Sequence, residues 1–274
     1  MAMNTVLKII LIFSILTLIT SCEEHTMTKN MVVSDADYNI ENIDISKIAQ
    51  RKIYCGHQSV GFNILDGISD RMLRNPGVRL NIVRSKDVGV FSEPVFAHST
   101  IGENSDPELK ITDFKNTIDS GIGNNADIAF FKLCYLDINK TTKLEKVFSI
   151  YKNTMDQLKH EYPGTKFIHV TVPLTVSEFS IRDSIKKLLG RQDNNIMRNH
   201  FNDRLIAEYG GKDAIFNLAE IESTYPDGSR SSFIEDNNMY YSLAPEYASD
   251  NGHLNEIGRK IVATELLRLL SELK

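Results

Sequence analysis

The stretch "DIAFFKLCYL" at residues 127–136 is an almost unbroken run of apolar side chains. This composition is typical of a strand that helices cover on both faces of a parallel sheet. The chain has 274 residues, which is long enough to bury such a sheet in a substantial core. The stretch therefore predicts the central strand of a sheet with a helical layer on each side.

Segments with strand and helix patterns alternate along the rest of the chain. Further strand-like apolar runs lie at 51–56, 78–85, 166–174 and 214–221. Helical spacing of apolar residues covers 45–50, 59–73, 141–162, about 181–209 and 254–273. Alternation of this kind produces right-handed crossovers between parallel strands. We therefore expect a three-layer α/β/α fold around a mostly parallel, five-stranded sheet.

Two of the helices carry clear apolar faces. The first is expected to bury Val60, Ile64, Leu65, Ile68 and Met72. The closing helix is expected to bury Ile257, Ile261, Leu266, Leu269 and Leu270. Side chains at this spacing share one face of a helix, so each set predicts a helix packed against the sheet.

The loops that follow the strands hold nearly every chemically reactive side chain. These loops lie at 56–60, 86–108, 134–140, 173–180 and 222–253. In parallel α/β sheets, ligands bind at the carboxyl ends of the strands. This edge of the sheet is therefore where we expect a functional site.

Three residues in these loops have the side chains of a catalytic triad. Ser59 lies where the first strand meets a helix, and the free backbone N–H groups there favour negative charge. Serine becomes a nucleophile when a base removes its proton, and His253 is a candidate for that base. Asp250 lies three residues earlier and can fold back to orient the imidazole and stabilise its charged form. The spacing predicts a Ser59–His253–Asp250 triad that joins the two ends of the domain.

The stretch "DNGHLNEIG" at 250–258 resembles the closing block of the SGNH (GDSL-type) hydrolases. The first strand and its serine-bearing turn resemble the opening block of that family, and the similarity covers about residues 51–274. The resemblance implies a flavodoxin-like three-layer fold and serine-dependent hydrolysis of acyl or acetyl esters on carbohydrates or lipids. It implies no metal and no other cofactor. It also implies that Ser59 is the nucleophile, His253 the base and Asp250 the residue that orients it.

The chain departs from the family pattern in two places. His57-Gln58-Ser59 replaces Gly-Asp-Ser, and Leu136 in "KLCYLD" stands where the family has an oxyanion-binding asparagine. Leucine cannot donate a hydrogen bond, so this donor is missing or comes from another group. In "STIGENSDP", Gly102 matches the glycine of the family's second block. We expect the Ser59 and Gly102 N–H groups to bind the oxyanion, with Asn104 as a third donor.

Other polar side chains are candidates for contact with a substrate. His57 is expected to line the pocket, contact substrate or cap its turn, and His98 lies in a loop on the same side. Lys132 interrupts an apolar strand, and burying an unpaired ammonium group is costly. We therefore expect Lys132 to reach the strand end or to pair with an acid such as Asp137. Glu222 is expected in the wall of the site.

The amino-terminal segment differs from the rest of the chain. Lys8 precedes the apolar run "IILIFSILTLIT" at 9–20, which is short for a membrane span. The run ends at "ITSC", which resembles the lipobox of bacterial lipoproteins and implies lipidation of Cys22. We expect a signal peptide at 1–22, a flexible tether at 23–43 and a hydrolase domain at 44–274. An ordinary signal peptide or a membrane anchor is the alternative for this segment.

Charge and cysteine content narrow the functional classes further. The net charge is −5 and there is no long basic run, which argues against a nucleic-acid partner. Cys55 and Cys134 both lie in apolar, strand-like runs. Although exported proteins can form disulfides, buried free thiols are the simpler expectation for these two residues.

The sequence thus favours a membrane-tethered serine esterase of the bacterial cell envelope. We expect it to remove O-acyl or acetyl groups from a glycan or another small ester substrate. The glycan is suggested by aromatic rings in the loop at 224–252, which contains Tyr225, Tyr240, Tyr241 and Tyr247. The first alternative is an inactive, glycan-binding lipoprotein with the same fold. The second is metal-dependent hydrolysis by His57, His98, Asp250 and His253, whose spacing matches no familiar metal motif.

Overall fold

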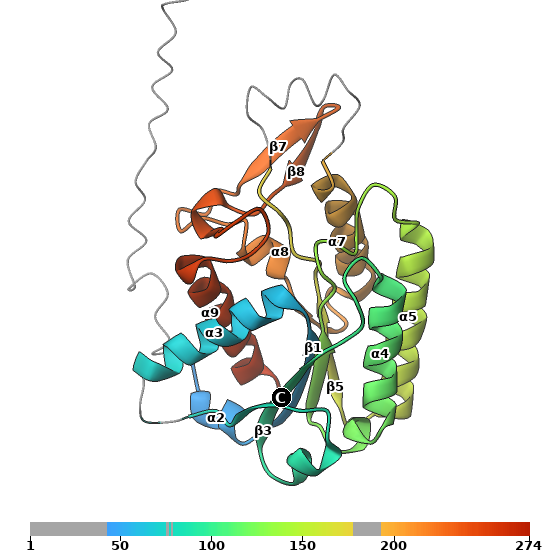
Figure 1. Cartoon of the computed structure of the whole chain (residues 1–274), viewed down its shortest axis with the longest axis vertical. Coiled ribbons are helices and arrows are strands. Elements are labelled where there is room, and N and C mark those ends of the chain that lie inside the picture. The colour runs from blue at the N-terminus through green and yellow to red at the C-terminus, as the bar shows by residue number, and fades with distance from the viewer. Residues whose placement is uncertain (1–42, 75–76, 78, 178–192) are drawn as a thin grey trace, which may run out of the picture. The chain divides into compact units, whose positions relative to one another are not determined.

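A six-stranded parallel sheet forms the centre of the computed structural model, which describes residues 43–74, 77, 79–177 and 193–274. The strand order is β2-β3-β1-β4-β5-β6 (Figure 1). The strands are β1 Lys52–His57, β2 Ile82–Arg84, β3 Val95–Thr100, β4 Ile128–Phe131, β5 Lys166–Val170 and β6 Ala214–Phe216. All neighbouring strands pair in parallel, so their carboxyl ends share one edge.

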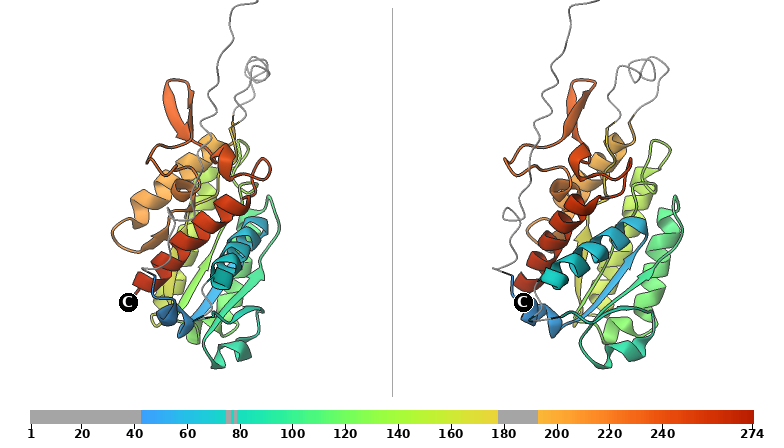
Figure 2. Two further views of the ribbon diagram at one scale, coloured as in Figure 1. Left: turned by 90° about the vertical axis from the view of Figure 1, so that its left-hand side faces the viewer. Right: turned by 60° about the vertical axis from the view of Figure 1, so that its left-hand side comes forward.

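Helices cover both faces of this sheet (Figures 1 and 2). The α-helices are α2 Ile45–Ala49, α3 Ser59–Arg74, α4 Pro107–Asp119, α5 Leu144–Glu161, α7 Asn195–Tyr209, α8 Leu218–Ile221 and α9 Glu256–Glu272. Helices α4, α5 and α7 pack on one face, and α3 and α9 pack on the other. The expected three-layer α/β/α architecture is confirmed.

Short elements complete the described chain. Three 3₁₀ segments are η2 Val88–Ser92, η3 Ile122–Asn124 and η4 Pro245–Tyr247. An antiparallel hairpin is formed by β7 Ser232–Glu235 and β8 Asn238–Tyr241. The hairpin lies within the stretch 224–252 that the sequence predicted to be irregular.

The expected number of strands was wrong, because β3 lies inside the predicted loop 86–108. The second half of β3 is polar, so the strand does not stand out in the sequence as an apolar run. Two of its polar side chains, His98 and Ser99, are nevertheless buried, and each has a hydrogen-bond partner. Ser99 Oγ lies 2.6 Å from Tyr54 Oη, and His98 Nδ1 lies 2.9 Å from His57 Nε2.

Other predicted boundaries also need correction. Helix α4 was not expected, and one of its inward side chains is Lys110. The strand predicted at 78–85 is confined to 82–84, and the one at 214–221 is a short strand followed by α8. The first part of the helix predicted at 181–209 lies outside the described residues.

The predicted apolar faces mostly pack as expected. All five residues of the α3 set are buried, and in the α9 set Ile261, Leu266 and Leu270 are buried while Leu269 is only half-buried. Ile257 is an exception, because it is 40% exposed. Gly258 faces the protein in its place, and a Cβ there would lie 2.5 Å from the Tyr247 carbonyl oxygen. The backbone of η4 therefore fills the space that the first turn of α9 would otherwise use.

Helices α3 and α9 pack against each other on one face of the sheet, although they come from opposite ends of the domain (Figure 2). A Cβ on Gly67 would lie 2.2 Å from the Arg259 carbonyl oxygen and 2.9 Å from the Ala263 Cβ. The Arg259 Nε atom donates to Asp70 Oδ2 over 2.8 Å. The absent side chain of Gly67 allows this close crossing, and the ion pair fixes its register.

Residues 1–42 lie outside the described part of the chain, and the predictions of a signal peptide, a lipidated Cys22 and a tether concern those residues. Within the described ranges, no helix has both the length and the apolar composition needed to cross a bilayer.

Replacing Gly67 with alanine tests the crossing of α3 and α9. Alanine favours a helix by about 1 kcal/mol over glycine. Because its methyl group would collide with backbone atoms, we expect a net loss of about 1–3 kcal/mol in the free energy of unfolding. Urea denaturation measures the change. Gly164→Ala is the control, since a methyl group there would have no atom within 4 Å. A Gly67→Ala protein as stable as that control would contradict the close crossing.

Candidate active site

Ser59 begins α3 at the carboxyl end of β1, as the sequence predicted. Only Gln58 separates it from the last residue of the strand. The Gln58 side-chain amide donates to the carbonyl oxygens of Ile101 and Gly102, each over 2.8 Å, and so ties the turn to the neighbouring loop. The first N–H groups of a helix have no carbonyl partner inside it. The Ser59 hydroxyl therefore lies beside backbone donors that can bind a negatively charged oxygen.

Asp250 and His253 form a hydrogen-bonded pair in the turn before α9. His253 Nδ1 lies 2.7 Å from Asp250 Oδ2. Because a carboxylate only accepts hydrogen bonds, the Nδ1 atom carries the proton and donates it to Asp250. In the neutral ring this leaves Nε2 unprotonated, with a lone pair available to a proton donor. The pair has the tautomer that a general base requires.

Backbone donors hold the Asp250 carboxylate in its charged form. The N–H groups of Gly252 and His253 both donate to Asp250 Oδ1 over 2.8 Å. The Gly252 bond is the largest cause that lowers the pKa of Asp250 to about 2, and the His253 side chain adds to it. Asp250 is therefore ionised at neutral pH and can stabilise a charged imidazolium.

One hydrogen bond brings the two halves of the predicted site together. The Leu254 N–H donates to Asn63 Oδ1 over 3.2 Å. Asn63 lies one helical turn beyond Ser59 on α3, and Leu254 directly follows His253. The turn that carries the imidazole thus rests on the start of the helix that carries the serine. In the described chain, no hydrogen bond joins the Ser59 hydroxyl to the His253 ring.

The expectation for the Gly102 N–H needs correction. This group donates to Asp113 Oδ2 on α4 over 2.8 Å, so it is not free to bind an oxyanion. Gly102 has a φ of +48°, and a Cβ there would lie 2.7 Å from Lys110 backbone nitrogen. The glycine thus permits a left-handed turn against α4. Its role in this structure is to shape the loop.

Asn104 and Asp137 belong to a polar network around Lys110. Asn104 Oδ1 accepts from Lys110 Nζ over 3.0 Å, and that ammonium also lies 2.7 Å from Asp137 Oδ2. The Lys110 and Asp137 side chains are 0% exposed. Asp137 also accepts from the backbone N–H groups of Ser105 and Cys134. The suggested pair of Lys132 with Asp137 is therefore wrong, while a substrate contact from Asn104 stays a prediction.

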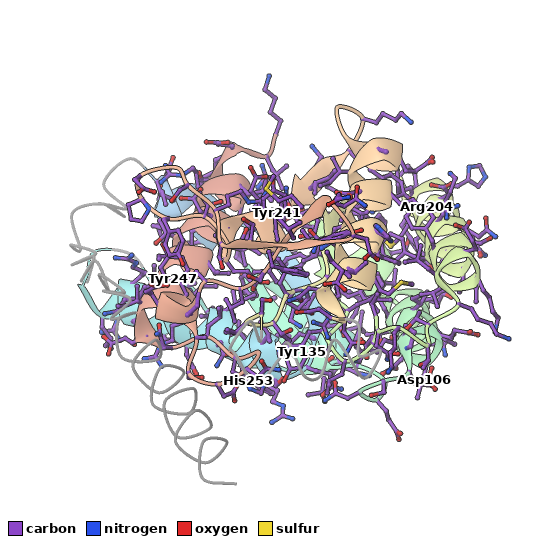
Figure 3. All side chains as sticks on the ribbon, turned by 90° about the horizontal axis from the view of Figure 1, so that it is seen from above. Asp106, Tyr135, Arg204, Tyr241, Tyr247 and His253 are labelled. Atoms are coloured by element: carbon purple, nitrogen blue, oxygen red, sulfur yellow. The ribbon has the colours of Figure 1, made fainter. Side chains whose placement is uncertain are left out.

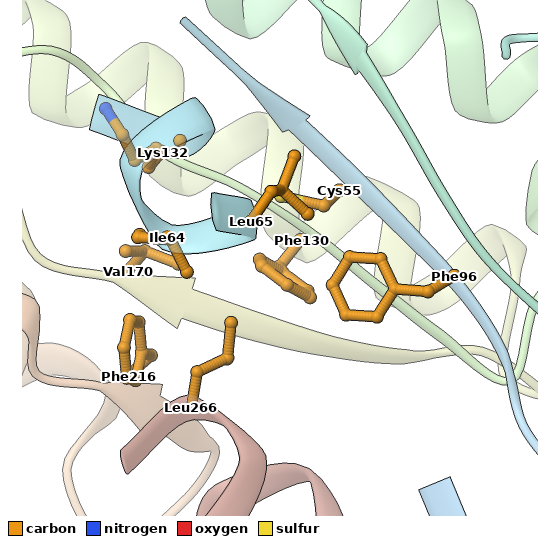
Figure 4. A pocket seen from close by; sticks show the side chains of 10 residues that line it. Cys55, Ile64, Leu65, Phe96, Phe130, Lys132, Val170, Phe216 and Leu266 are labelled. Carbon is orange, nitrogen blue, oxygen red and sulfur yellow. The ribbon is translucent and has the colours of Figure 1, made fainter. Parts of the chain in front are cut away.

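Lys132 lines a small cavity between the sheet and the α3–α9 layer (Figure 4). Its Nζ atom donates to the Leu133 carbonyl oxygen over 3.2 Å, and the residue is 3% exposed. The other cavity-lining residues include Cys55, Phe96, Phe130, Val170, Phe216 and Leu266. The cavity has a volume of about 10 Å³, which is room for roughly one water molecule. Lys132 is thus a buried residue of this layer, away from solvent.

His57 and His98 form a second buried pair. His57 Nδ1 faces the Gln58 carbonyl oxygen at 2.8 Å and must donate to it, so its Nε2 accepts from His98 Nδ1. Burial lowers the pKa of His57 to about 4 and also lowers that of His98, so both rings are neutral at pH 7. His98 lies on β3 instead of in a loop. The packing of His57 on Gly61, where a Cβ would lie 2.3 Å from the ring, indicates a role in shaping the serine turn.

Tyr135 is a residue near the predicted triad that the sequence reasoning did not select. Its ring centroid lies 5.8 Å from that of His253, with an interplanar angle of 81° (Figure 3). The neighbouring Leu136, at the expected asparagine position, is 40% exposed and has no donor side chain. Its position in the loop directly after the central strand could have identified Tyr135 from the sequence as a candidate for the site.

The structure also places the other residues that the sequence singled out. Cys55 and Cys134 are buried free thiols, as expected. Glu222 is the C-cap that follows α8, is 1% exposed, and accepts a hydrogen bond from the Leu174 N–H. Among the residues whose positions are described, no group of three or more His, Cys, Asp or Glu side chains is placed to hold a metal ion.

The structure of this chain is similar to several solved structures at low sequence identity. No family model and no curated protein matches it. A member of the lipolytic G-D-S-L family from Veillonella parvula is 13% identical at a TM-score of 0.45, over 81% of this chain and 98% of that protein. The periplasmic domain of a lipopolysaccharide acetyltransferase from Salmonella ser. Paratyphi A is 12% identical at a TM-score of 0.46, over 81% and 85%.

The buried carboxyl of Glu222 predicts a specific pH dependence. Burial raises its pKa to about 8, and the Leu174 N–H, Lys132 and Arg198 oppose this only in part. The unfolded chain has the ordinary value near 4.5. Between these values the folded protein binds more protons than the unfolded one, so its contribution to stability is lost as pH rises from 4.5 through 8.

A Glu222→Gln variant isolates this contribution. Glutamine can still accept from the Leu174 N–H but does not titrate. The free energy of unfolding of the variant relative to wild type should therefore increase as pH rises from 4.5 to 8. Urea denaturation at several pH values measures the difference, and a constant difference would contradict the assignment.

Proposed function

We propose that this protein is a divergent SGNH-type hydrolase that cleaves a small ester with a Ser59–His253–Asp250 triad. The observation that carries the proposal is the Asp250–His253 pair, bound through Leu254 to Asn63 one turn beyond Ser59. Asp250 Oδ1 serves the turn itself, because it accepts the Gly252 and His253 N–H groups. Oδ2 is left to orient the imidazole, and a serine hydrolase needs this second contact.

The reaction follows from the protonation states of these groups. His253 Nε2 removes the Ser59 hydroxyl proton as the oxygen attacks the ester carbonyl carbon, and Asp250 stabilises the imidazolium that forms. The imidazolium then protonates the departing alcohol and leaves an acyl group on Ser59. Water, activated by the same imidazole, releases the acid and restores the serine. Catalytic hydrogen bonds often shorten only when substrate is bound, so an unbonded Ser59 hydroxyl is compatible with this role.

The oxyanion site of the proposed enzyme is sparse, because it has few hydrogen-bond donors. The Ser59 N–H is the main donor, because the Gly102 N–H is bound to Asp113 and Leu136 cannot donate. The Asn104 amide is a further candidate. Loss of one oxyanion donor typically costs roughly 10²–10³-fold in kcat, so slow turnover is expected.

A short acyl group on a carbohydrate is the proposed substrate. An acetyl or similarly short group is the acyl part that the resemblance to the SGNH hydrolases implies. Fewer tyrosine rings of the loop at 224–252 are free to pack against a sugar than the sequence predicted. Tyr247 is fully buried, with its hydroxyl donating to the Thr224 carbonyl oxygen, and Arg230 covers the Tyr241 ring. Tyr225 and Tyr240 remain half-buried candidates.

The sparse oxyanion site also favours a second candidate, a glycan-binding protein without turnover. It would bind acylated sugars through the same face and be insensitive to loss of the His253 imidazole.

Replacing Ser59 with alanine tests the proposed enzyme. Hydrolysis of p-nitrophenyl acetate by Ser59→Ala should fall by at least about 10³-fold, because the nucleophile is removed. Asp250→Asn should also lower kcat strongly, since the imidazole loses its charged partner. Ser69→Ala is the control, because its hydroxyl is on the same helix and only donates to the Leu65 carbonyl oxygen. Full activity in Ser59→Ala would rule out the triad, and absence of turnover in wild type would favour the binding protein.

We also propose that Cys22 anchors the protein to a bacterial membrane. The support is the lipobox-like "ITSC" after the apolar run at 9–20. Cells that express the full chain should incorporate labelled palmitate into the protein and retain it in the membrane fraction. Cys22→Ser should abolish the label, while Cys55→Ser should not, because that thiol is buried. Equal labelling of both variants would exclude lipidation at Cys22.

A further inference from the structure

The hydrogen bond to Asp250 is a weak constraint on the His253 ring by itself. The Asp250 side chain is 57% exposed and that of His253 is 31% exposed. A solvent-exposed pair of this kind is a weak interaction, because water competes for both partners. A ring held by no more than this would often leave its catalytic orientation. A second contact is needed to fix the imidazole.

The Tyr135 ring supplies such a contact. It meets the imidazole nearly at right angles, with 5.8 Å between ring centroids (Figure 3). Edge-to-face aromatic pairs add a favourable interaction beyond the area they bury. This is comparable to the exposed hydrogen bond, so the two contacts together constrain the ring far better than either alone.

Gly252 makes the approach of Tyr135 possible. A Cβ at Gly252 would lie 2.6 Å from the Cε1 and Cζ atoms of the tyrosine. The φ angle of Gly252 is not in the left-handed region, so its backbone does not require glycine. The space taken by the Tyr135 ring is therefore what excludes a side chain at this position.

Arg198 fixes the tyrosine in turn. Its guanidinium carbon lies 5.7 Å from the Tyr135 ring centroid, and its Nε donates to the Tyr135 carbonyl oxygen over 2.8 Å. Arg198 is 3% exposed and also donates to Thr175 Oγ1 and Asn195 Oδ1. Tyr135 is thus held by a buried, well-bonded side chain from α7.

We propose that Tyr135 is a positioning residue for the catalytic imidazole, acting through its contact with the Gly252–His253 turn. The inference rests on the proposed function and extends it to a residue outside the triad. The aromatic ring of Tyr135 makes this contact, and the Tyr135 hydroxyl is not required for it.

Kinetics of the full chain with p-nitrophenyl acetate test the ring and the hydroxyl separately. Tyr135→Leu should lower kcat roughly 10–100-fold with KM within about threefold of wild type, because the base is misplaced while the binding surface remains. Tyr135→Phe should keep kcat within about twofold, because it retains the ring. Tyr162→Leu is the matched control. That tyrosine also packs on a glycine, Gly123, but at the opposite edge of the sheet.

A double-mutant cycle tests the contact itself. Gly252→Ala should lower kcat in the wild-type background, since its methyl group displaces the ring. In the Tyr135→Leu background it should cause little further loss, because the contact is already gone. Additive losses, or wild-type kcat in Tyr135→Leu, would overturn the proposal.

Nuclear magnetic resonance of histidine-labelled protein separates this inference from the proposed function, because it needs no turnover. The His253 ring signal, assigned by its loss in His253→Gln, should shift in Tyr135→Leu and stay near its wild-type position in Tyr135→Phe. An unchanged signal in Tyr135→Leu would overturn the positioning role. Full esterase activity in Ser59→Ala would instead overturn the triad and leave the ring contact in place.

Discussion

The close packing of α3 against α9 is the constraint on which the rest of the site depends. Asn63 and Leu254 are 191 residues apart, yet they are hydrogen-bonded because the two helices pack together on the same face of the sheet. The missing side chain of Gly67 lets the helices approach to backbone contact, and Asp70 and Arg259 hold their relative position. Both helices begin at the same edge of the sheet. The turn that carries His253 therefore rests, through Leu254, on the first turns of the helix that begins with Ser59.

The parts of the fold that the sequence predicted are those where burial and apolar composition coincide. The central strand and the apolar face of α3 are of this kind. Strand β3 was missed because His98 and Ser99 are polar and are buried only through partners on β1, which a local pattern does not reveal. Helix α4 was missed for a related reason, since one of its most buried side chains is Lys110.

The candidate site likewise contains contacts that could be predicted from the sequence and contacts that could not. Asp250 and His253 are three residues apart, so their hydrogen bond could be predicted from one turn. The Gly102 N–H depends on Asp113, which belongs to the unpredicted helix, so its partner could not be foreseen. The contact between Tyr135 and Gly252 joins distant parts of the chain. No local pattern in either segment indicates it, because the fold alone brings the Tyr135 ring against Gly252.

Polar groups in the loops around Ser59 are mostly bound to other protein groups. Gln58 holds the loop at 101–102, and Lys110 gathers Asn104 and Asp137. Such bonding keeps the loops in place but leaves few donors for a ligand. The chemistry proposed here consequently depends on the start of α3 and on the turn before α9.

The pair of Lys110 and Asp137 has a consequence for how this sequence can change during evolution. Both side chains are completely buried, and removing one would leave an uncompensated charge at a cost of about 3–5 kcal/mol. That loss is a large share of the total stability of an ordinary domain. The two positions are therefore expected to be inherited as a unit, with descendants keeping both charges or replacing both by apolar residues.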